Sequence, residues 1–455
     1  AAGGLRGPSR GANYQIQDYA GAFGDTHFVS TRSVNEFRFQ FANRDYNVLP
    51  ADPFGPEISI NGVAFLGRDF FLPSTRNEKR YQFVDNFTFV TGRHELKFGG
   101  DFHCLPFNTV TEVFLGGRFI FGEAIPLGLV LDSFSGPGTA QSLGAAFAAT
   151  GRADLIPSLS APLTSLQSFN LGLPIVYQQG FGDPRASLTN KIVDGYVQDN
   201  FSVKPDLTLN IGLRYDAELQ PTPVHRDKNN WGPRIGFAYS PSSRTVIRGG
   251  YGVYYATLYE AVAFVQRALD GTQISQVFVP ITGLPQLGIN ATSAQVWGLA
   301  KQLGAIGNRV LTAADIARLG LRPGTTPPVL LSTDASIVNP YSQQFSLGVD
   351  REIPGDINLS LNYLGNRGVK LIRSRNRNLQ QVGRNAYGPT FAAINPRILQ
   401  DNQVESSGSS IYHGMALGLT KRYSSHYQFQ VSYTLSKAID DTTDFITDLQ
   451  PANQL

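Results

Sequence analysis

The stretch DLTLNIGLRYD, residues 206–216, alternates apolar and polar residues almost without interruption. The apolar residues share one parity, and they are Leu207, Leu209, Ile211, Leu213 and Tyr215. Such a period of two indicates a β-strand with one apolar and one polar face. The apolar face needs an apolar neighbour along its whole length. That neighbour is either a second sheet of the protein or lipid, so this pattern limits the fold to two classes.

The same alternation recurs along the chain, in stretches longer than the usual strand of ~5–6 residues. The further examples are residues 22–30, 34–42, 231–240, 343–351, 356–365 and 426–437. Tight turns rich in Gly, Pro, Ser and Asp join them in pairs, at 90–94, 203–207, 240–244, 353–356 and 423–426. Long irregular segments separate the pairs, at 42–79, 218–230, 257–340 and 366–409. The sequence therefore predicts hairpins with one tight end and one elaborate end.

The strands at 93–102 and 192–203 are expected to run in opposite directions across the sheet. The segment between them must therefore contain an even number of further wall strands. Residues 112–122 and 173–182 supply two candidates, with a small helix at 139–150 between them. This brings the prediction to about fourteen strands. Residues 311–320 instead have a helical pattern with Thr312 as N-cap, so we expect a short helix inside a large loop.

A soluble β-sandwich also alternates apolar and polar residues, and this alternative is the commoner one for such a pattern. Three features favour a membrane barrel. The strands reach the ~9–11 residues that cross a bilayer at a tilt. Charged residues make up only 16% of the chain, so Gln, Asn, Ser, Thr and Gly dominate the polar faces. Turn and loop lengths are asymmetric, as in outer-membrane barrels. The sequence contains no apolar run of ~18 residues, which excludes a transmembrane helix.

Aromatic residues near the strand ends fit the girdles of a membrane barrel. These residues are Tyr215, Tyr239, Tyr254, Tyr255, Tyr363, Tyr423 and Tyr427. We therefore predict an all-β fold, a transmembrane antiparallel β-barrel with long extracellular loops.

Longer motifs resemble a known family. IVDGYVQDNFSVKPDLTLNIGLRYD (192–216) and RHELKFGGDF (93–102) resemble signatures of TonB-dependent outer-membrane transporters. Residues 30–47, 230–255 and 409–441 resemble the Oar-like branch more narrowly. The resemblance implies a barrel of about twenty-two strands with a plug domain and a TonB box, neither of which is visible here. We expect residues 1–455 to be an incomplete segment of one outer-membrane barrel domain. The loop-like end TDLQPANQL and the start AAGGLRGPSR, which does not resemble a signal peptide, fit this expectation.

The resemblance implies energised uptake or export of a large solute, such as a chelate, an oligosaccharide or a peptide. It also implies a Gram-negative outer membrane as the location, with lipid, a plug domain and a TonB–ExbB–ExbD complex as partners. The long loops 42–79, 257–340 and 366–409 would capture the ligand. The alternative is a surface β-protein without transport, an adhesin or a structural outer-membrane protein.

Catalytic chemistry has no support in the sequence. G-x-S-x-G, P-loop and H-E-x-x-H motifs are missing, so we predict no enzyme and no cofactor. The net charge is +3, without a long block of one sign, which gives no support to nucleic-acid binding. The chain has one cysteine, Cys104, and therefore no disulfide framework.

The sequence contains two weak metal motifs, and neither is sufficient to predict a metal site. His94, His103 and Cys104 form a loose group, but the two histidines have opposite parity on a strand. RDKNNWG (226–232) faintly resembles an oxygen-rich calcium loop through Asp227, Asn229 and Asn230. An ordinary polar turn explains that segment better.

If the apolar side faces lipid, a set of polar residues faces the lumen and contacts a plug or a passing solute. These residues are Gln198, Asn200, Asn210, Arg214 and Asp216. The simpler explanation for any one of them is that a hydrated lumen needs polar side chains. Arg214 and Asp216 lie two apart and can pair across neighbouring strands, so they are the preferred plug contacts.

Overall fold

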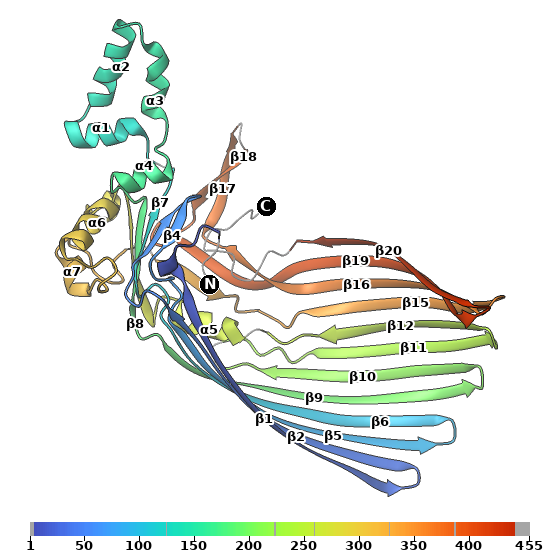
Figure 1. The fold of residues 1–455 in the computed structure, drawn as a ribbon. Coiled ribbons are helices and arrows are strands. Elements are labelled where there is room, and N and C mark those ends of the chain that lie inside the picture. The colour runs from blue at the N-terminus through green and yellow to red at the C-terminus, as the bar shows by residue number, and fades with distance from the viewer. Residues whose placement is uncertain are drawn as a thin grey trace.

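The computed structural model describes residues 4–441, apart from 124, 223, 259, 327 and 386–387. The predicted terminal loop at 447–455 lies outside the described residues. A thirteen-stranded sheet, called the wall below, dominates the fold (Figure 1). Its order is β1-β2-β5-β6-β9-β10-β11-β12-β15-β16-β19, with β20 and the short β14 both paired to β19. Every neighbouring pair is antiparallel except β14 with β19.

The wall strands follow the chain in order. Their bounds are β1 (Ala12–Ser30), β2 (Ser33–Pro50), β5 (Ser74–Thr91), β6 (His94–Thr111), β9 (Arg185–Lys204), β10 (Leu207–Leu219), β11 (Asn230–Ser242), β12 (Thr245–Tyr255), β14 (Val329–Thr333), β15 (Tyr341–Ile353), β16 (Ile357–Asn376), β19 (Gln400–Ser424) and β20 (Tyr427–Asp440). Within the described part of the chain, β1 pairs only with β2 at one edge of the wall, and the edge strand β20 pairs only with β19. The wall is therefore an open sheet in this structure.

Two predicted wall strands are elsewhere. Residues 112–122 and 173–182 contribute β7 (Arg118–Phe121) and β8 (Val176–Gly182), which belong to a second sheet. The prediction was wrong because β6 pairs directly with β9, from His94↔Phe201 to Val110↔Arg185. β6 and β9 form a hairpin with a very long connection. They therefore run in opposite directions without further wall strands between them.

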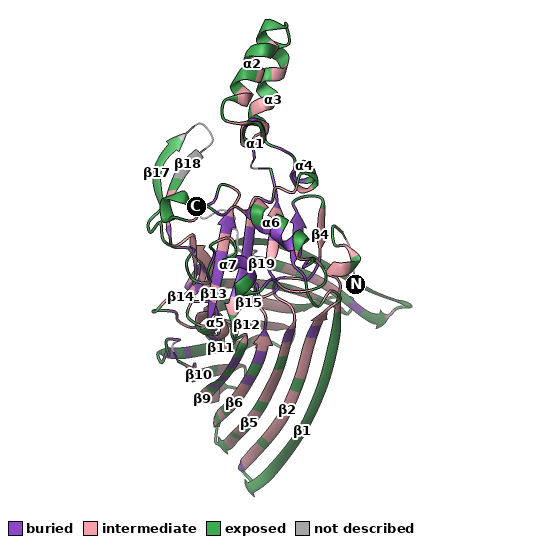
Figure 2. Ribbon diagram, turned by 90° about the vertical axis from the view of Figure 1, so that its left-hand side faces the viewer, coloured by how far each residue is buried: buried purple, intermediate pink, exposed green. Residues whose placement is uncertain are grey.

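Apolar side chains on one side of the wall are exposed, without cover from the described residues. On β10, Ile211 is 51% exposed and Leu213 is 40% exposed. Phe98, Val197 and Ile235 on neighbouring strands are exposed as well. Figure 2 shows that exposed and half-buried residues predominate along the wall strands. A soluble sandwich would bury these side chains against a second sheet. The structure instead confirms the predicted transmembrane antiparallel β-sheet, whose apolar face is available to lipid.

Aromatic pairs mark one end of this apolar face. The rings of Tyr215 and Trp231 are 4.6 Å apart, and those of Tyr255 and Tyr341 are 5.3 Å apart. Tyr254 was predicted to belong to the same girdle, but the Arg234 guanidinium lies 4.4 Å from its ring centre. Tyr254 points to the polar face, since its parity is opposite to that of Tyr255.

All the short turns lie at one end of the wall and all the long connections at the other (Figure 1). This asymmetry assigns the long connections to the extracellular side. Two of them span 51–73 and 377–399, shorter than the predicted 42–79 and 366–409, because the flanking strands continue beyond the apolar region. The segment 112–184 is a further long connection.

Three of the long connections combine into one folded unit, which we call the loop domain. Its five-stranded sheet has the order β13-β8-β7-β3-β4, with β3 (Glu57–Ile60), β4 (Ala64–Leu66) and β13 (Ile274–Pro280). Helices α4 (Ser165–Asn170), α6 (Ser293–Gln302) and α7 (Ala313–Ala317) complete the unit. Phe119, Phe121, Tyr177 and Trp297 form the centre of its hydrophobic core.

The remaining elements lie outside the wall and the loop domain. A projecting arm contains α1 (Leu127–Ser135), α2 (Thr139–Ala149) and α3 (Ile156–Ser160), and α2 confirms the helix predicted at 139–150 (Figure 1). The others are α5 (Glu260–Ala268), the hairpin β17 (Leu379–Asn385) and β18 (Gly388–Ala393), and the 3-10 turns Pro8–Arg10, Ala153–Leu155 and Pro285–Leu287. Among the described residues, the helices are too short or too polar to span a membrane.

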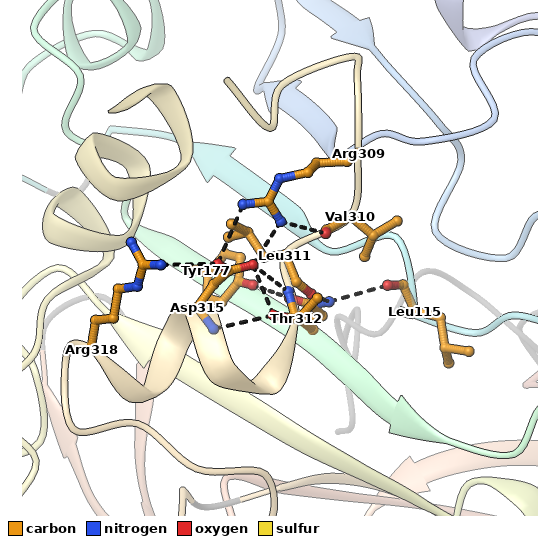
Figure 3. Close-up of polar contacts among 9 residues, drawn as sticks. Leu115, Tyr177, Arg309, Val310, Leu311, Thr312, Asp315 and Arg318 are labelled. Atoms are coloured by element: carbon orange, nitrogen blue, oxygen red, sulfur yellow. Dashed lines mark hydrogen bonds and ion pairs between the residues drawn. The ribbon is translucent and has the colours of Figure 1, made fainter. Parts of the chain in front are cut away.

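Helix α7 confirms the predicted helix and its cap (Figure 3). The Thr312 N–H donates to Asp315 Oδ2 at 2.9 Å, and the Asp315 N–H donates to Thr312 Oγ1 at 3.2 Å. Arg309 Nη1 lies 2.7 Å from the same carboxylate oxygen. The Arg309 hydrogen bond, together with the Thr312 N–H, holds the pKa of Asp315 well below its usual value.

A second set of bonds joins two loops. Gln179 Nε2 donates to the carbonyl oxygens of Leu311, at 2.8 Å, and Leu115, at 3.3 Å. The Tyr177 hydroxyl donates to Gln179 Oε1. Residues more than a hundred positions apart are thus linked beneath α7, so the loop domain behaves as one packed body rather than as separate loops.

A charge placed on the apolar face should destabilise the wall. Replacing Ile211 with Lys is expected to cost about 2–4 kcal/mol, because the ammonium group would enter the hydrocarbon region. Asn210→Lys is the matched control on the opposite face and should cost much less. Urea unfolding in lipid vesicles measures both, and equal losses would contradict the assignment of faces.

The loop domain should lose stability in acid through Asp315. Because its folded pKa is depressed, Asp315 stabilises the domain above pH ~4. That contribution disappears as the pH falls through the folded pKa. In a Trp231→Phe background, Trp297 fluorescence reports the unfolding midpoint of the loop domain. This midpoint should fall as the pH is lowered, and it should fall less steeply in Asp315→Asn than in the parent protein. Asp154→Asn, in an exposed ion pair with Arg152, should leave the pH dependence unchanged.

Candidate functional site on the polar face and at the extracellular mouth

The predicted polar residues all lie on β9 and β10. Their parity places them on the face opposite Ile211 and Leu213, and the register pairs Asn210 with Asn200. Gln198 Nε2 donates to Asn200 Oδ1 at 2.9 Å, and Asn200 Nδ2 donates to Glu95 Oε2 on β6 at 3.0 Å. The structure thus joins Gln198 and Asn200 into a hydrogen-bonded ladder that spans two strands.

Asn210 lies beside that ladder, opposite Asn200 in the register. It borders a shallow groove of about 250 Å³ together with Gln198, Arg234 and Gln344. Amide and guanidinium groups line this part of the polar face. Such a surface can donate and accept hydrogen bonds without making or breaking any covalent bond.

Arg214 is the centre of an ion-pair network. Its Nε lies 2.6 Å from Asp216 Oδ1 on the same strand, and its Nη2 lies 2.8 Å from Asp194 Oδ2 on β9. The predicted pairing across strands therefore exists, but the partner is Asp194, which the sequence analysis missed. The sequence did contain a signal for Asp194: its even position in the predicted strand at 192–203 places it on the same face as Asp216. The Asp194 side chain is only 8% exposed.

Two residues of β6 extend this network. His103 Nε2 lies 3.0 Å from Asp101 Oδ1, and the Gln82 amide donates to both Asp101 oxygens at 3.0 and 3.2 Å. The potential metal-ligand atoms of Asp101, His103 and Asp194 lie within 4.8 Å of one another. Gln82 donates to Asp101 and Arg214 pairs with Asp194 Oδ2, whereas Asp194 Oδ1 has no hydrogen-bond partner in the structure. The group is a polar network of the wall.

The structure does not bring His94, His103 and Cys104 together. His94 Nδ1 lies 2.7 Å from Asp199 Oδ2, and the His94 ring stacks on Phe201 near a short turn. Cys104 has the opposite parity to His103 on β6 and therefore points away from it.

The extracellular mouth contains a buried polar network. Glu218, 3% exposed, accepts hydrogen bonds from Asn190 Nδ2 at 2.6 Å, Gln220 Nε2 at 2.6 Å, Asn339 Nδ2 at 2.5 Å and the Leu258 N–H at 2.9 Å. Sequence reasoning missed Glu218, because its partners come from three segments far apart in the chain.

A wider cleft lies beside β1, β2 and β5 at the same end. It has a volume of about 680 Å³ and is lined by arginines and aromatic rings, among them Arg44, Arg76, Tyr14, Tyr46 and Phe71. The Arg76 guanidinium lies 5.9 Å from the Tyr46 ring centre. Asp69 and Glu78 also line the cleft, so its charged side chains are of both signs.

The sequence matches a family model described as an outer membrane beta barrel domain, over residues 2–227 and 218–454. The chain belongs to this family. Membership assigns the barrel wall to the outer membrane, in agreement with its uncovered apolar face and extracellular loop domain. No curated protein gives a significant match to the chain.

Two solved structures align with most of the chain, and the first of them shares its fold. The outer membrane transporter YddB from Escherichia coli aligns with 94% of this chain at 11% identity and a TM-score of 0.53. The FrpB iron transporter from Neisseria meningitidis aligns with 95% at 12% identity and a TM-score of 0.48. The alignments cover 43% of YddB and 46% of FrpB. This outer membrane β-barrel chain thus spans less than half the length of either protein.

Removing the Arg214 side chain should destabilise the wall of this outer membrane β-barrel. Arg214→Ala leaves the buried Asp194 carboxylate without its cation, which is expected to cost about 3 kcal/mol. Arg248→Ala breaks the exposed pair with Asp350 on the same face, and this control should cost under ~1 kcal/mol. Urea unfolding in vesicles compares the two. Similar losses would show that the Asp194 network contributes nothing beyond an exposed pair.

Proposed function

We propose that this chain forms wall and extracellular parts of an outer-membrane transporter of the TonB-dependent class, in its Oar-like branch. The observation that carries the proposal is the continuous polar face of a wall whose edge strands β1 and β20, within the described residues, each pair on one side only. Unpaired backbone groups are costly in lipid, so such edges call for further strands. A barrel wider than this wall encloses a lumen large enough for a plug.

The cargo in this proposal is a solute too large for a diffusion pore, such as a chelate, an oligosaccharide or a peptide. A plug domain of the same full-length protein closes the lumen, and a TonB–ExbB–ExbD complex moves it. The motifs at 93–102 and 192–216 support this class. So does the fold shared with YddB, which is described as an outer membrane transporter. No bond is made or broken, so the protein is not an enzyme.

In this proposal the polar face is the surface that a plug or a moving solute contacts. Gln198, Asn200 and Asn210 offer neutral hydrogen-bonding groups, whereas Arg214 and Asp216 offer charges held in a fixed orientation. Asp194 belongs with them, since it completes the Arg214 network. The loop domain would present one preformed surface to the cargo, because its connections share a core.

A second candidate is a surface protein without transport, such as an adhesin. One observation favours it: the arm, α1 to α3, projects away from the wall (Figure 1), and its side chains Leu129 and Ile156 are exposed. Apolar surface of this kind suits contact with another macromolecule.

The test uses cells with the intact gene, cells without it, and cells without TonB, grown in the same medium. Mass spectrometry of the spent medium measures which large solutes are depleted. We expect a solute that only cells with both proteins remove. A variant lacking residues 125–163, the arm, should keep this depletion.

Two results would overturn the transport proposal. One is identical depletion in all three strains. The other combines two observations: cells with the arm-deleted protein lose surface attachment, and solute depletion does not depend on TonB. That combination would establish the adhesin alternative.

A further inference from the structure

Asp101, His103 and Asp194 gather on the polar face of the wall, near the middle of β6 and β9. The register pairs Asp101 with Asp194, and His103 lies two residues further along β6 on the same face. Their potential metal-ligand atoms lie within 4.8 Å of one another. Phe98 and Phe102, of the other parity on β6, are exposed apolar residues of the opposite face. Two adjacent strands therefore bring two carboxylates and one imidazole to one place.

One ligand atom of this group is buried without a partner. The Asp194 side chain is only 8% exposed, and its Oδ2 lies 2.8 Å from Arg214 Nη2. Asp194 Oδ1 is buried and has no hydrogen-bond partner in the described part of the chain. Buried carboxylate oxygens in proteins are normally hydrogen-bonded, paired with a charge or bound to a metal ion. The free Oδ1 is therefore a position that calls for a further partner.

The negative charges of the network exceed its positive charges. Asp216 faces Asp194 in the register of β9 and β10, so Asp101, Asp194 and Asp216 lie on three neighbouring strands. Within the described residues, Arg214 is the one lysine or arginine in ion-pair contact with any of them. Three carboxylates and one guanidinium leave a surplus of two negative charges when His103 is neutral. A divalent cation would balance this surplus.

The contacts already present are compatible with a metal ion. His103 Nε2 lies 3.0 Å from Asp101 Oδ1, and two ligand atoms bound to one zinc ion lie roughly 3 Å apart or slightly more. The Gln82 amide donates to both Asp101 oxygens, at 3.0 and 3.2 Å, but each carboxylate oxygen has two lone pairs. Gln82 and Arg214 would then orient the ligands from behind, as the hydrogen-bond partners of metal-binding carboxylates do.

We propose that Asp101, His103 and Asp194 bind a zinc ion on the polar face of the wall. Zinc takes imidazole nitrogen and carboxylate oxygen as ligands, and three protein ligands leave a further position for water. The imidazole makes calcium and magnesium unsuitable, because these ions prefer sets of oxygen ligands. Binding uses the lone pair of His103 Nε2, so any proton on that nitrogen leaves to solvent.

The ion would join two neighbouring strands of the wall. Asp101 and His103 belong to β6 and Asp194 belongs to β9, and the long connection 112–184 separates these strands in the chain. Zinc would therefore add a link between them on the polar face, and it would remove the repulsion between their carboxylates. The inference does not depend on transport, because it concerns metal binding and the stability of the wall.

The experiment uses the full-length protein extracted from outer membranes in detergent, treated with EDTA and then freed of it. Zinc binding is measured by isothermal titration calorimetry, and thermal unfolding is followed by circular dichroism with zinc chloride or calcium chloride. Cobalt chloride is a second probe, because the visible absorption of bound cobalt reports its coordination. The variants are His103→Gln and Asp101→Asn. The matched control is His94→Gln, since His94 lies on the same strand and contacts the single carboxylate of Asp199.

We expect zinc to bind and to raise the unfolding temperature, and calcium at the same concentration to do neither. His103→Gln and Asp101→Asn should each raise the zinc dissociation constant on the order of 10-fold or more and weaken the cobalt absorption. His94→Gln should keep the parental response. Ile192→His gives an independent test if the other variants do not fold. Ile192 faces His103 in the register, so a fourth ligand at this position should lower the dissociation constant.

Three results would overturn the proposal. The first is a folded, heat-modifiable protein that binds neither zinc nor cobalt, which would assign Asp194 Oδ1 to water or to a bound proton. The second is zinc binding that His103→Gln, Asp101→Asn and Ile192→His all leave unchanged. The third is an equal loss of binding in His94→Gln, which would locate the metal elsewhere in the protein.

Discussion

Backbone hydrogen bonding between neighbouring strands is the constraint on which the rest of this structure depends. Lipid offers no partner for an N–H or C=O group, so each spanning strand must pair with its neighbours along its length. The long antiparallel registers, such as β5 with β6 and β6 with β9, meet this requirement. Pairing then fixes the two faces of the wall, because successive side chains point to opposite sides.

The polar face shows how a wall can hold charges in fixed positions. Arg214 contacts one carboxylate on its own strand and another on the neighbouring strand. The contact with Asp194 follows from the register, which aligns Asp216 with Asp194, and Asp216 lies two residues from Arg214 on the same face of β10. These ion pairs hold the Arg214 guanidinium in one orientation.

The extracellular side is built by a different principle. The loop domain has an aromatic core, a capped helix and a sheet assembled from three connections. Its connections therefore behave as parts of one body. The buried carboxylate Glu57 of the loop domain has a guanidinium partner, whereas Glu218 in the mouth beneath it has only amide and backbone donors.

The sequence by itself determined the wall strands, the asymmetry of their connections, the helix with its cap at Thr312, and the polar face containing Arg214 and Asp216. These features are local, since alternation, turn residues and capping act over a few positions. Tertiary structure decided that residues 112–122 and 173–182 join a second sheet, that Asp194 completes the Arg214 network, and that Glu218 meets Asn190 and Asn339. Pairing and burial between distant segments depend on the whole arrangement of strands, and no short stretch of sequence contains that information.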